Sequence, residues 1–112
     1  MWKVIHSIVT GLIIALGSVH VAFTASGYEH LSLDALWFFS TGVAIILAGS
    51  LNVATIRQSG NDPVVRLMCL MANLVFVALF GIAMSLMRQL QVFVGVGLFA
   101  VAAVCVSQRA RR

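Results

Sequence analysis

The chain has 112 residues, of which 62% are hydrophobic and only 9% are charged, and its formal net charge is +4. Soluble domains are about 45–50% apolar and about 25% charged, so this chain has too little polar surface to cover itself in water. The composition excludes a soluble domain, a disordered chain and a nucleic-acid-binding protein, and it favours a protein whose solvent is lipid.

Four apolar segments predict four α-helices, over residues 4–26, 35–56, 64–87 and 89–107. Each has roughly 19–24 residues, which at about 1.5 Å per residue crosses a hydrocarbon core of about 30 Å. No strand-like alternation of polar and apolar residues is present. We therefore predict an all-α polytopic membrane protein, a single transmembrane domain over residues 1–112 folded as an antiparallel bundle of four transmembrane helices. Asp34 is predicted to cap the second helix, and Asn61 or Asp62 the third.

The basic residues predict the orientation of these helices. With the N-terminus inside, six of the seven lysines and arginines lie on the cytoplasmic side and only Arg88 lies outside. Cytoplasmic segments of membrane proteins carry such an excess of positive charge. We expect a multi-pass protein of the bacterial inner membrane with both termini in the cytoplasm and with membrane lipids around it.

Polar and small residues recur along each segment at alternating steps of three and four, which places them on one helix face. The four faces are His6, Thr10, Ile13, Gly17, His20 and Thr24; Trp37, Thr41, Ala44, Ala48, Asn52 and Thr55; Arg66, Cys69, Asn73, Phe76, Phe80 and Ala83; and Gln91, Gly95, Leu98, Ala102 and Cys105. Polar groups avoid lipid, so these faces are predicted to point inward. Asn52 and Asn73 are expected in the interior, with a direct bond between them left open, and no disulfide is expected.

The outer ends of these faces provide the candidate ligand site. We predict a small outward-facing pocket, capped by the loop Tyr28–Ser32 and lined by His20, Thr24, Trp37, Thr41 and Gln91. A few convergent polar groups in apolar walls are the usual form of a small-ligand site. The alternative is a filled, hydrogen-bonded helix end.

His20 is the most informative of these residues, because a buried imidazole needs both a donor and an acceptor partner. With Glu29 and His30 in the following loop it could bind a divalent metal, and alone it could ligate haem or relay protons. The spacing matches no metal-binding signature, so no metal site is predicted. The cofactor stays unknown, with haem and quinone as alternatives.

The stretch Trp37–Asn52 (WFFSTGVAIILAGSLN) resembles uncharacterised small bacterial inner-membrane proteins with a W-F-x-x-x-G…G-x-x-N pattern, a resemblance that implies an architecture and no activity. The length and helix number are also similar to those of small multidrug-resistance transporters, but no acidic residue lies within the four segments. The fluoride-channel family has a similar size and a polar and phenylalanine track like Asn73, Phe76 and Phe80, although its glycine-rich and asparagine motifs are not matched.

The absence of a carboxylate pair, a Ser–His–Asp set or a CxxC motif predicts a protein that is not an enzyme. We expect a structural or accessory membrane protein that associates with itself as a homo-oligomer or with a larger membrane complex. The alternative is a small transporter, a channel, or a lipid-, quinone- or haem-binding protein that uses a polar pocket around His20. Nucleic acid is not an expected partner.

Overall fold

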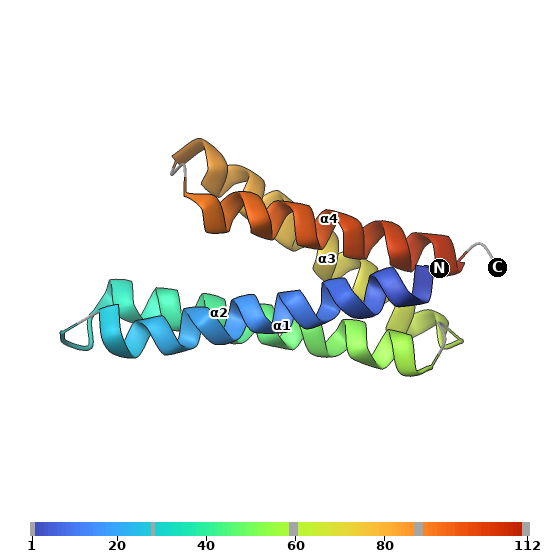
Figure 1. Cartoon of the computed structure of the whole chain (residues 1–112), viewed down its shortest axis with the longest axis horizontal. Helices are drawn as coiled ribbons and strands as arrows, with labels where there is room; N and C mark the ends of the chain where they lie inside the picture. Colours follow the sequence, from blue (N-terminus) through green and yellow to red (C-terminus); the bar gives the residue numbers. More distant parts are fainter. Residues whose placement is uncertain (1, 28, 59–60, 87–88, 111–112) are drawn as a thin grey trace.

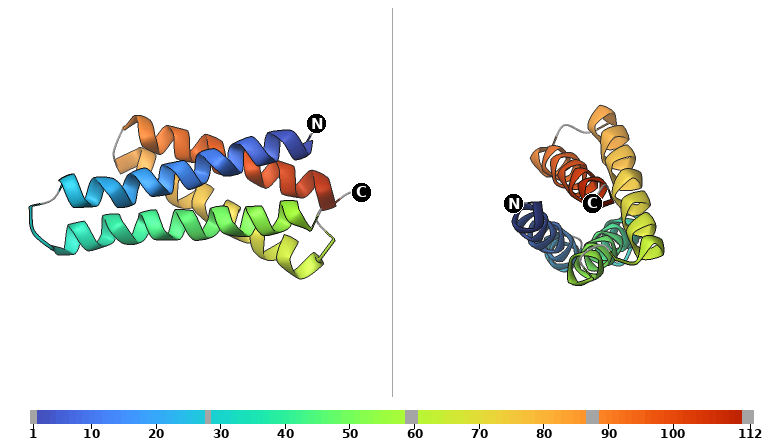
Figure 2. Two further views of the ribbon diagram at one scale, coloured as in Figure 1. Left: turned by 60° about the horizontal axis from the view of Figure 1, so that its bottom comes forward. Right: turned by 90° about the vertical axis from the view of Figure 1, so that its right-hand side faces the viewer.

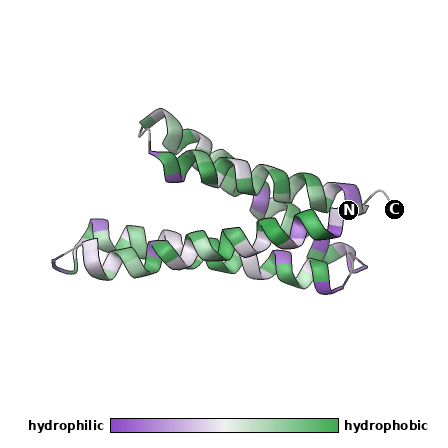
Figure 3. Ribbon diagram, in the orientation of Figure 1, coloured by the Kyte–Doolittle hydropathy of each residue, from purple (hydrophilic) through white to green (hydrophobic). Residues whose placement is uncertain are grey.

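A computed structural model describes residues 2–27, 29–58, 61–86 and 89–110, and these residues form four helices without a strand. The helices are α1 (Trp2–Gly27), α2 (Leu33–Arg57), α3 (Pro63–Leu86) and α4 (Leu90–Ala110). All four are long and apolar enough to cross a membrane, and Figure 3 shows hydrophobic residues along most of their length. The predicted all-α class and four apolar helices are confirmed. Residue 87, the predicted end of the third helix, lies outside the described residues.

Side-chain oxygens satisfy the free N–H groups at the start of α2 and α3. The Asp62 carboxylate accepts hydrogen bonds from the backbone N–H groups of Val64 at 2.9 Å and Val65 at 3.3 Å, as the sequence predicted. In α2 the prediction was wrong, because the capping residue is Ser32, whose hydroxyl oxygen accepts from the Ala35 N–H at 3.2 Å. Asp34 lies in the first turn of α2 instead, where its negative charge interacts favourably with the positive end of the helix dipole.

The helices pair as two hairpins, α1 with α2 and α3 with α4, and the two hairpins meet at one end of the molecule (Figure 1). We call this the terminal end, because the start of α1 and the end of α4 lie there, together with the end of α2 and the start of α3. At the opposite end, the open end, the two hairpins diverge (Figure 1). Figure 2 shows in addition that α3 is inclined to α2, so that the two helices separate along their length.

Two glycines allow α1 and α2 to pack with their backbones close together. A Cβ atom added to Gly17 would lie 2.9 Å from the carbonyl oxygen of Gly42, and one added to Gly42 would lie 2.9 Å from the carbonyl oxygen of Gly17. Side chains at either position would therefore push the helices apart. Close approach at small residues is the usual way in which membrane helices gain packing energy.

Phenylalanines fill the space between α3 and α4. Phe76 stacks on Phe99 with ring centroids 4.7 Å apart, and Phe80 lies 6.0 Å from the same ring. Gly95 provides the room for Phe80, since a Cβ at Gly95 would come within 2.9 Å of the Phe80 ring. Phe80 and Phe99 join Ile13, Ile45 and other buried residues in one apolar core that links the two hairpins.

Candidate functional site

The terminal end holds a buried hydrogen-bonded cluster, the asparagine network, formed by His6, Asn52, Cys69 and Asn73. All four side chains are fully buried. The Asn52 carbonyl oxygen accepts from His6 Nε2 at 2.8 Å, from Asn73 Nδ2 at 3.1 Å and from the Cys69 thiol at 3.2 Å. The Asn52 amide in turn donates to the Asn73 carbonyl oxygen and to the Ala48 carbonyl, both at 2.9 Å.

This network joins α1, α2 and α3 through one carboxamide. The prediction that Asn52 and Asn73 face the interior is confirmed, and the bond that was left open exists as a reciprocal pair. The two bonds show that Asn52 on α2 and Asn73 on α3 lie at one level of the bundle. The small side chains of the asparagine network are hydrogen-bonded to one another, and such groups are suited to holding membrane helices in register.

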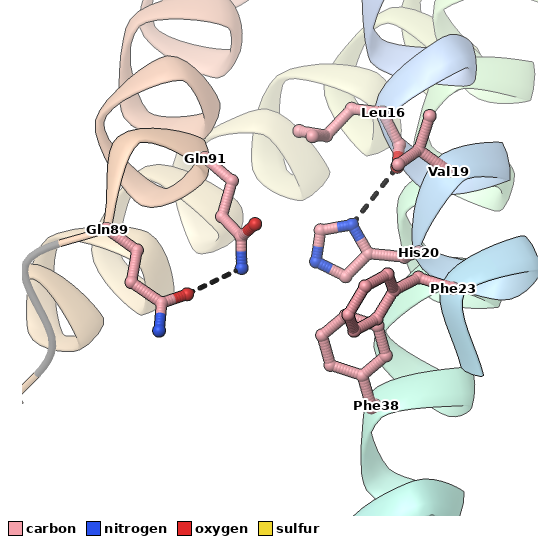
Figure 4. A pocket seen from close by; sticks show the side chains of 7 residues that line it. All are labelled: Leu16, Val19, His20, Phe23, Phe38, Gln89 and Gln91. Atoms are coloured by element: carbon pink, nitrogen blue, oxygen red, sulfur yellow. Dashed lines mark hydrogen bonds between the residues drawn. The ribbon is translucent and has the colours of Figure 1, made fainter. Parts of the chain in front are cut away.

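The open end contains two adjoining cavities between the hairpins. The first, the α1-side cavity, has a volume of about 370 Å³ and is lined by Leu16, Val19, His20, Phe23, Phe38, Gln89 and Gln91 (Figure 4). The second, the α2–α3 cavity, has a volume of about 490 Å³ and is lined by His20, Trp37, Phe38, Ser40, Thr41, Ala44, Phe76, Leu79, Phe80, Ala83, Gln91 and Val92. The two share His20, Phe38 and Gln91, so His20 stands between them.

His20 is held in one orientation by its own hairpin. Its ring stacks on Phe38 at a centroid distance of 4.6 Å and an interplanar angle of 17°, and only 6% of the residue is exposed. Ring nitrogen Nδ1 lies 3.1 Å from the Leu16 carbonyl oxygen. A carbonyl can only accept, so Nδ1 carries the proton, and in a neutral imidazole the other nitrogen, Nε2, presents a lone pair.

The second ring nitrogen of His20 is turned into the α1-side cavity, toward Gln91 on the opposite hairpin (Figure 4). Among the residues that the structure describes, none forms a hydrogen bond with it. The Gln91 amide donates to the Gln89 side-chain oxygen at 2.8 Å, and the carbonyl oxygen of Gln91 faces the His20 side (Figure 4). Two hydrogen-bond acceptors therefore face each other across a space between the hairpins.

Four of the five predicted pocket residues line these cavities: His20 and Gln91 line both, and Trp37 and Thr41 line the second. Thr24 lines neither cavity; its hydroxyl donates to the His20 backbone carbonyl at 2.9 Å. Tyr28 of the predicted cap lies outside the described residues, and Glu29 and His30 are exposed. Within the described part of the chain, no three His, Cys, Asp or Glu side chains come together as a metal site.

The prediction that the polar and small face of α2 points into the bundle was wrong for the first half of the helix. Trp37 is 66% exposed and Thr41 is also exposed, whereas Ala48 and Thr55 on the same face are buried. These residues recur at three- and four-residue steps, so they share one side of α2. At the terminal end α3 covers that side, but at the open end α3 has diverged, and the same side becomes a cavity wall (Figure 1).

Sequence reasoning missed the aromatic walls. Phe38, Phe76 and Phe80 line the α2–α3 cavity, and Phe38 also fixes the His20 ring. The sequence predicts Phe76 and Phe80 on the inward face of their helix, but not as walls of a ligand site. The signal that could have found Phe38 is its distance of four residues from Gly42, which marks the side of α2 that packs against α1.

Comparison with models of protein families, with curated protein sequences and with solved structures gives no match. The resemblance of the stretch Trp37–Asn52 to small bacterial inner-membrane proteins therefore stays a prediction.

Proposed function

We propose that the protein is a small, non-catalytic membrane protein that binds a lipid-soluble molecule in the cavities between its two hairpins. Four helices of sufficient length and hydropathy support its place in a membrane. The distribution of basic residues supports the bacterial inner membrane with both termini in the cytoplasm. In that orientation the open end, with His20, lies toward the periplasm.

The observation that carries this proposal is the buried His20 imidazole with its second nitrogen directed into a cavity. A polar group at this depth is costly without a partner. It is held in position by the Leu16 carbonyl and by Phe38, both from its own hairpin. The walls of the two cavities that meet at His20 are predominantly apolar, and together they come from all four helices. Such a combination of apolar walls and one oriented polar group is typical of small-ligand sites.

Filling the α2–α3 cavity tests the proposal. Ala83 lines that cavity, and Ala78, on the same helix, is exposed. Ala83→Phe should therefore displace a bound molecule, whereas Ala78→Phe adds the same ring to the outer surface and should not. Each protein is purified from membranes in mild detergent, and retained lipid-soluble molecules are identified by native mass spectrometry and by solvent extraction.

The expected result is a specific molecule that co-purifies with the wild-type chain and with Ala78→Phe but not with Ala83→Phe. Equal retention of the same lipids by all three proteins would show that the cavities hold only bulk lipid, and the proposal would then be wrong. Circular dichroism of each variant establishes that its helices are intact.

A second candidate, self-association of an accessory protein, is supported by the outer face of α1. Small residues recur there at three- and four-residue steps, and all are exposed: Ser7, Gly11, Ala15, Ser18 and Ala22. A Cβ on Gly11 would meet no atom within 4 Å. Small residues on an outer face allow a second helix to approach closely.

A matched pair of glycines tests this candidate. Gly97 on α4 also has open space around its Cβ, but no comparable series of small residues surrounds it. If α1 mediates self-association, Gly11→Leu should shift the detergent-solubilised protein to a smaller mass by light scattering, and Gly97→Leu should leave the mass unchanged. An identical mass for both variants and the wild type would exclude α1 as the interface.

A further inference from the structure

The chemistry of the cavity walls limits the charge of any ligand that they hold. Among the described residues that line the two cavities, none carries a formal charge. The polar groups on the walls are the His20 ring, the Trp37 indole N–H, the Gln89 and Gln91 carboxamides and the hydroxyls of Ser40 and Thr41. An ionised head group buried here would have no counter-ion and would be strongly disfavoured. The ligand is therefore expected to be uncharged.

The hydrogen bonds already made next to His20 favour one polarity for a ligand head placed there. His20 has used its ring N–H on the Leu16 carbonyl, which leaves the lone pair of Nε2 directed into the cavity (Figure 4). Gln91 has used one amide N–H on Gln89, and its carbonyl oxygen faces the same space. His20 Nε2 and the Gln91 oxygen both accept hydrogen bonds, so a head placed between these two atoms is complementary when it donates, as a hydroxyl does.

Aromatic side chains favour a flat ring next to that hydroxyl. Trp37, Phe38, Phe76 and Phe80 line the α2–α3 cavity, and Phe38 is stacked on His20. Aromatic rings gain about 0.5–1.5 kcal/mol beyond the burial of area when they pack offset or edge-to-face. The volume of the α2–α3 cavity, about 490 Å³, lies within the usual range of small-ligand sites.

We propose that the two adjoining cavities bind an uncharged phenol or hydroquinone with an apolar tail, whose hydroxyl donates to His20 Nε2 while its ring packs between the aromatic walls of the α2–α3 cavity. This inference rests on the proposed function, which it narrows to one class of ligand. Its sharpest consequence is a preference for a hydroquinone over the corresponding quinone. The quinone has the same ring and tail but no hydroxyl, so it donates no hydrogen bond to the acceptors on His20 and Gln91.

The test uses three probes with the same tail: decyl-benzohydroquinone, decyl-benzoquinone and decanol. Each is equilibrated, without oxygen, between empty lipid nanodiscs and nanodiscs that hold the full chain, and the bound fraction and its redox state are measured by chromatography. One neutral hydrogen bond is worth about a factor of ten in affinity, so the hydroquinone should bind about tenfold more tightly than the quinone. Decanol, which keeps the hydroxyl but lacks the ring, should bind more weakly than the hydroquinone.

Two variants assign the preference to His20. His20→Phe keeps a ring that can stack on Phe38 but removes the nitrogen acceptor, so hydroquinone and quinone should bind equally. His30→Phe makes the same substitution in an exposed loop residue and should leave the preference intact. Gln91→Leu should also weaken hydroquinone binding, and it keeps the test informative if His20→Phe does not fold.

Several results would overturn the inference. Equal or tighter binding of the quinone by the wild type would show that the head is not a hydrogen-bond donor, and equal binding of decanol would show that the ring is not recognised. A lack of binding of all three probes would exclude the ligand class. These results test only the class of ligand. The broader proposal is tested separately, by whether any specific lipid-soluble molecule co-purifies with the wild type and is lost in Ala83→Phe.

Discussion

Removing the Asn52 carboxamide should lower the unfolding free energy of the protein, because Asn52 is the centre of the asparagine network that joins the two hairpins. Asn52→Leu keeps a side chain of similar volume but removes four hydrogen bonds to other helices: one to His6, one to Cys69 and a reciprocal pair to Asn73. Hydrogen bonds between membrane helices average about 0.6 kcal/mol each. The expected loss of unfolding free energy is therefore about 2–3 kcal/mol, near the upper end because the abandoned partners stay buried.

A substitution elsewhere on α2 provides the control. The Ser50 hydroxyl is exposed and donates only to the Ile46 carbonyl of its own helix, at 3.0 Å. Ser50→Ala should change the unfolding free energy by less than about 0.5 kcal/mol. Both variants can be unfolded reversibly in mixed micelles of a mild and a denaturing detergent and followed by circular dichroism.

A double-mutant cycle assigns the loss to the asparagine pair itself. Asn52→Leu and Asn73→Leu each remove the same two reciprocal bonds, so the double variant should be more stable than the sum of the single effects predicts, by about 1 kcal/mol. If Asn52→Leu unfolds like Ser50→Ala, or if the two asparagine substitutions are additive, the network does not hold the hairpins together and the reasoning is refuted.

Three further predictions follow from the packing and the charge distribution. Gly42→Ala should lower the unfolding free energy by about 1–3 kcal/mol, because the new Cβ would lie 2.8 Å from the His20 Cβ; Gly81→Ala, where no atom lies within 4 Å, should cost nothing measurable. In intact spheroplasts a membrane-impermeant thiol reagent should label His30→Cys and spare Asn61→Cys, and the opposite pattern would reverse the orientation. Both native cysteines are buried thiols outside any disulfide, so after denaturation without reductant a thiol-reactive mass tag should modify both, and modification of neither would contradict this.

Helix number, helix bounds and the core face of α1 could be predicted from the sequence because they depend on local composition and period. A long apolar segment must satisfy its backbone within itself in lipid, which makes it helical whatever surrounds it. The spacing of His6, Ile13 and Gly17 places them on one side of α1, and this spacing predicts a buried side whichever helices pack against it. All three residues are buried. The asparagines were predictable as interior residues for the same reason, since an amide in lipid is costly.

The open end of the molecule was decided only by the tertiary structure. Trp37 and Ala48 occupy the same side of α2, yet Trp37 is 66% exposed beside a cavity and Ala48 is buried. The difference is the inclination of α3, which no local pattern in α2 encodes. At the terminal end α3 approaches α2, and the Asn52 amide nitrogen lies 2.9 Å from the Asn73 carbonyl oxygen. At the open end α3 has diverged, and the cavities around His20 lie there. Two helices that meet at one end and are inclined to each other must diverge at the opposite end.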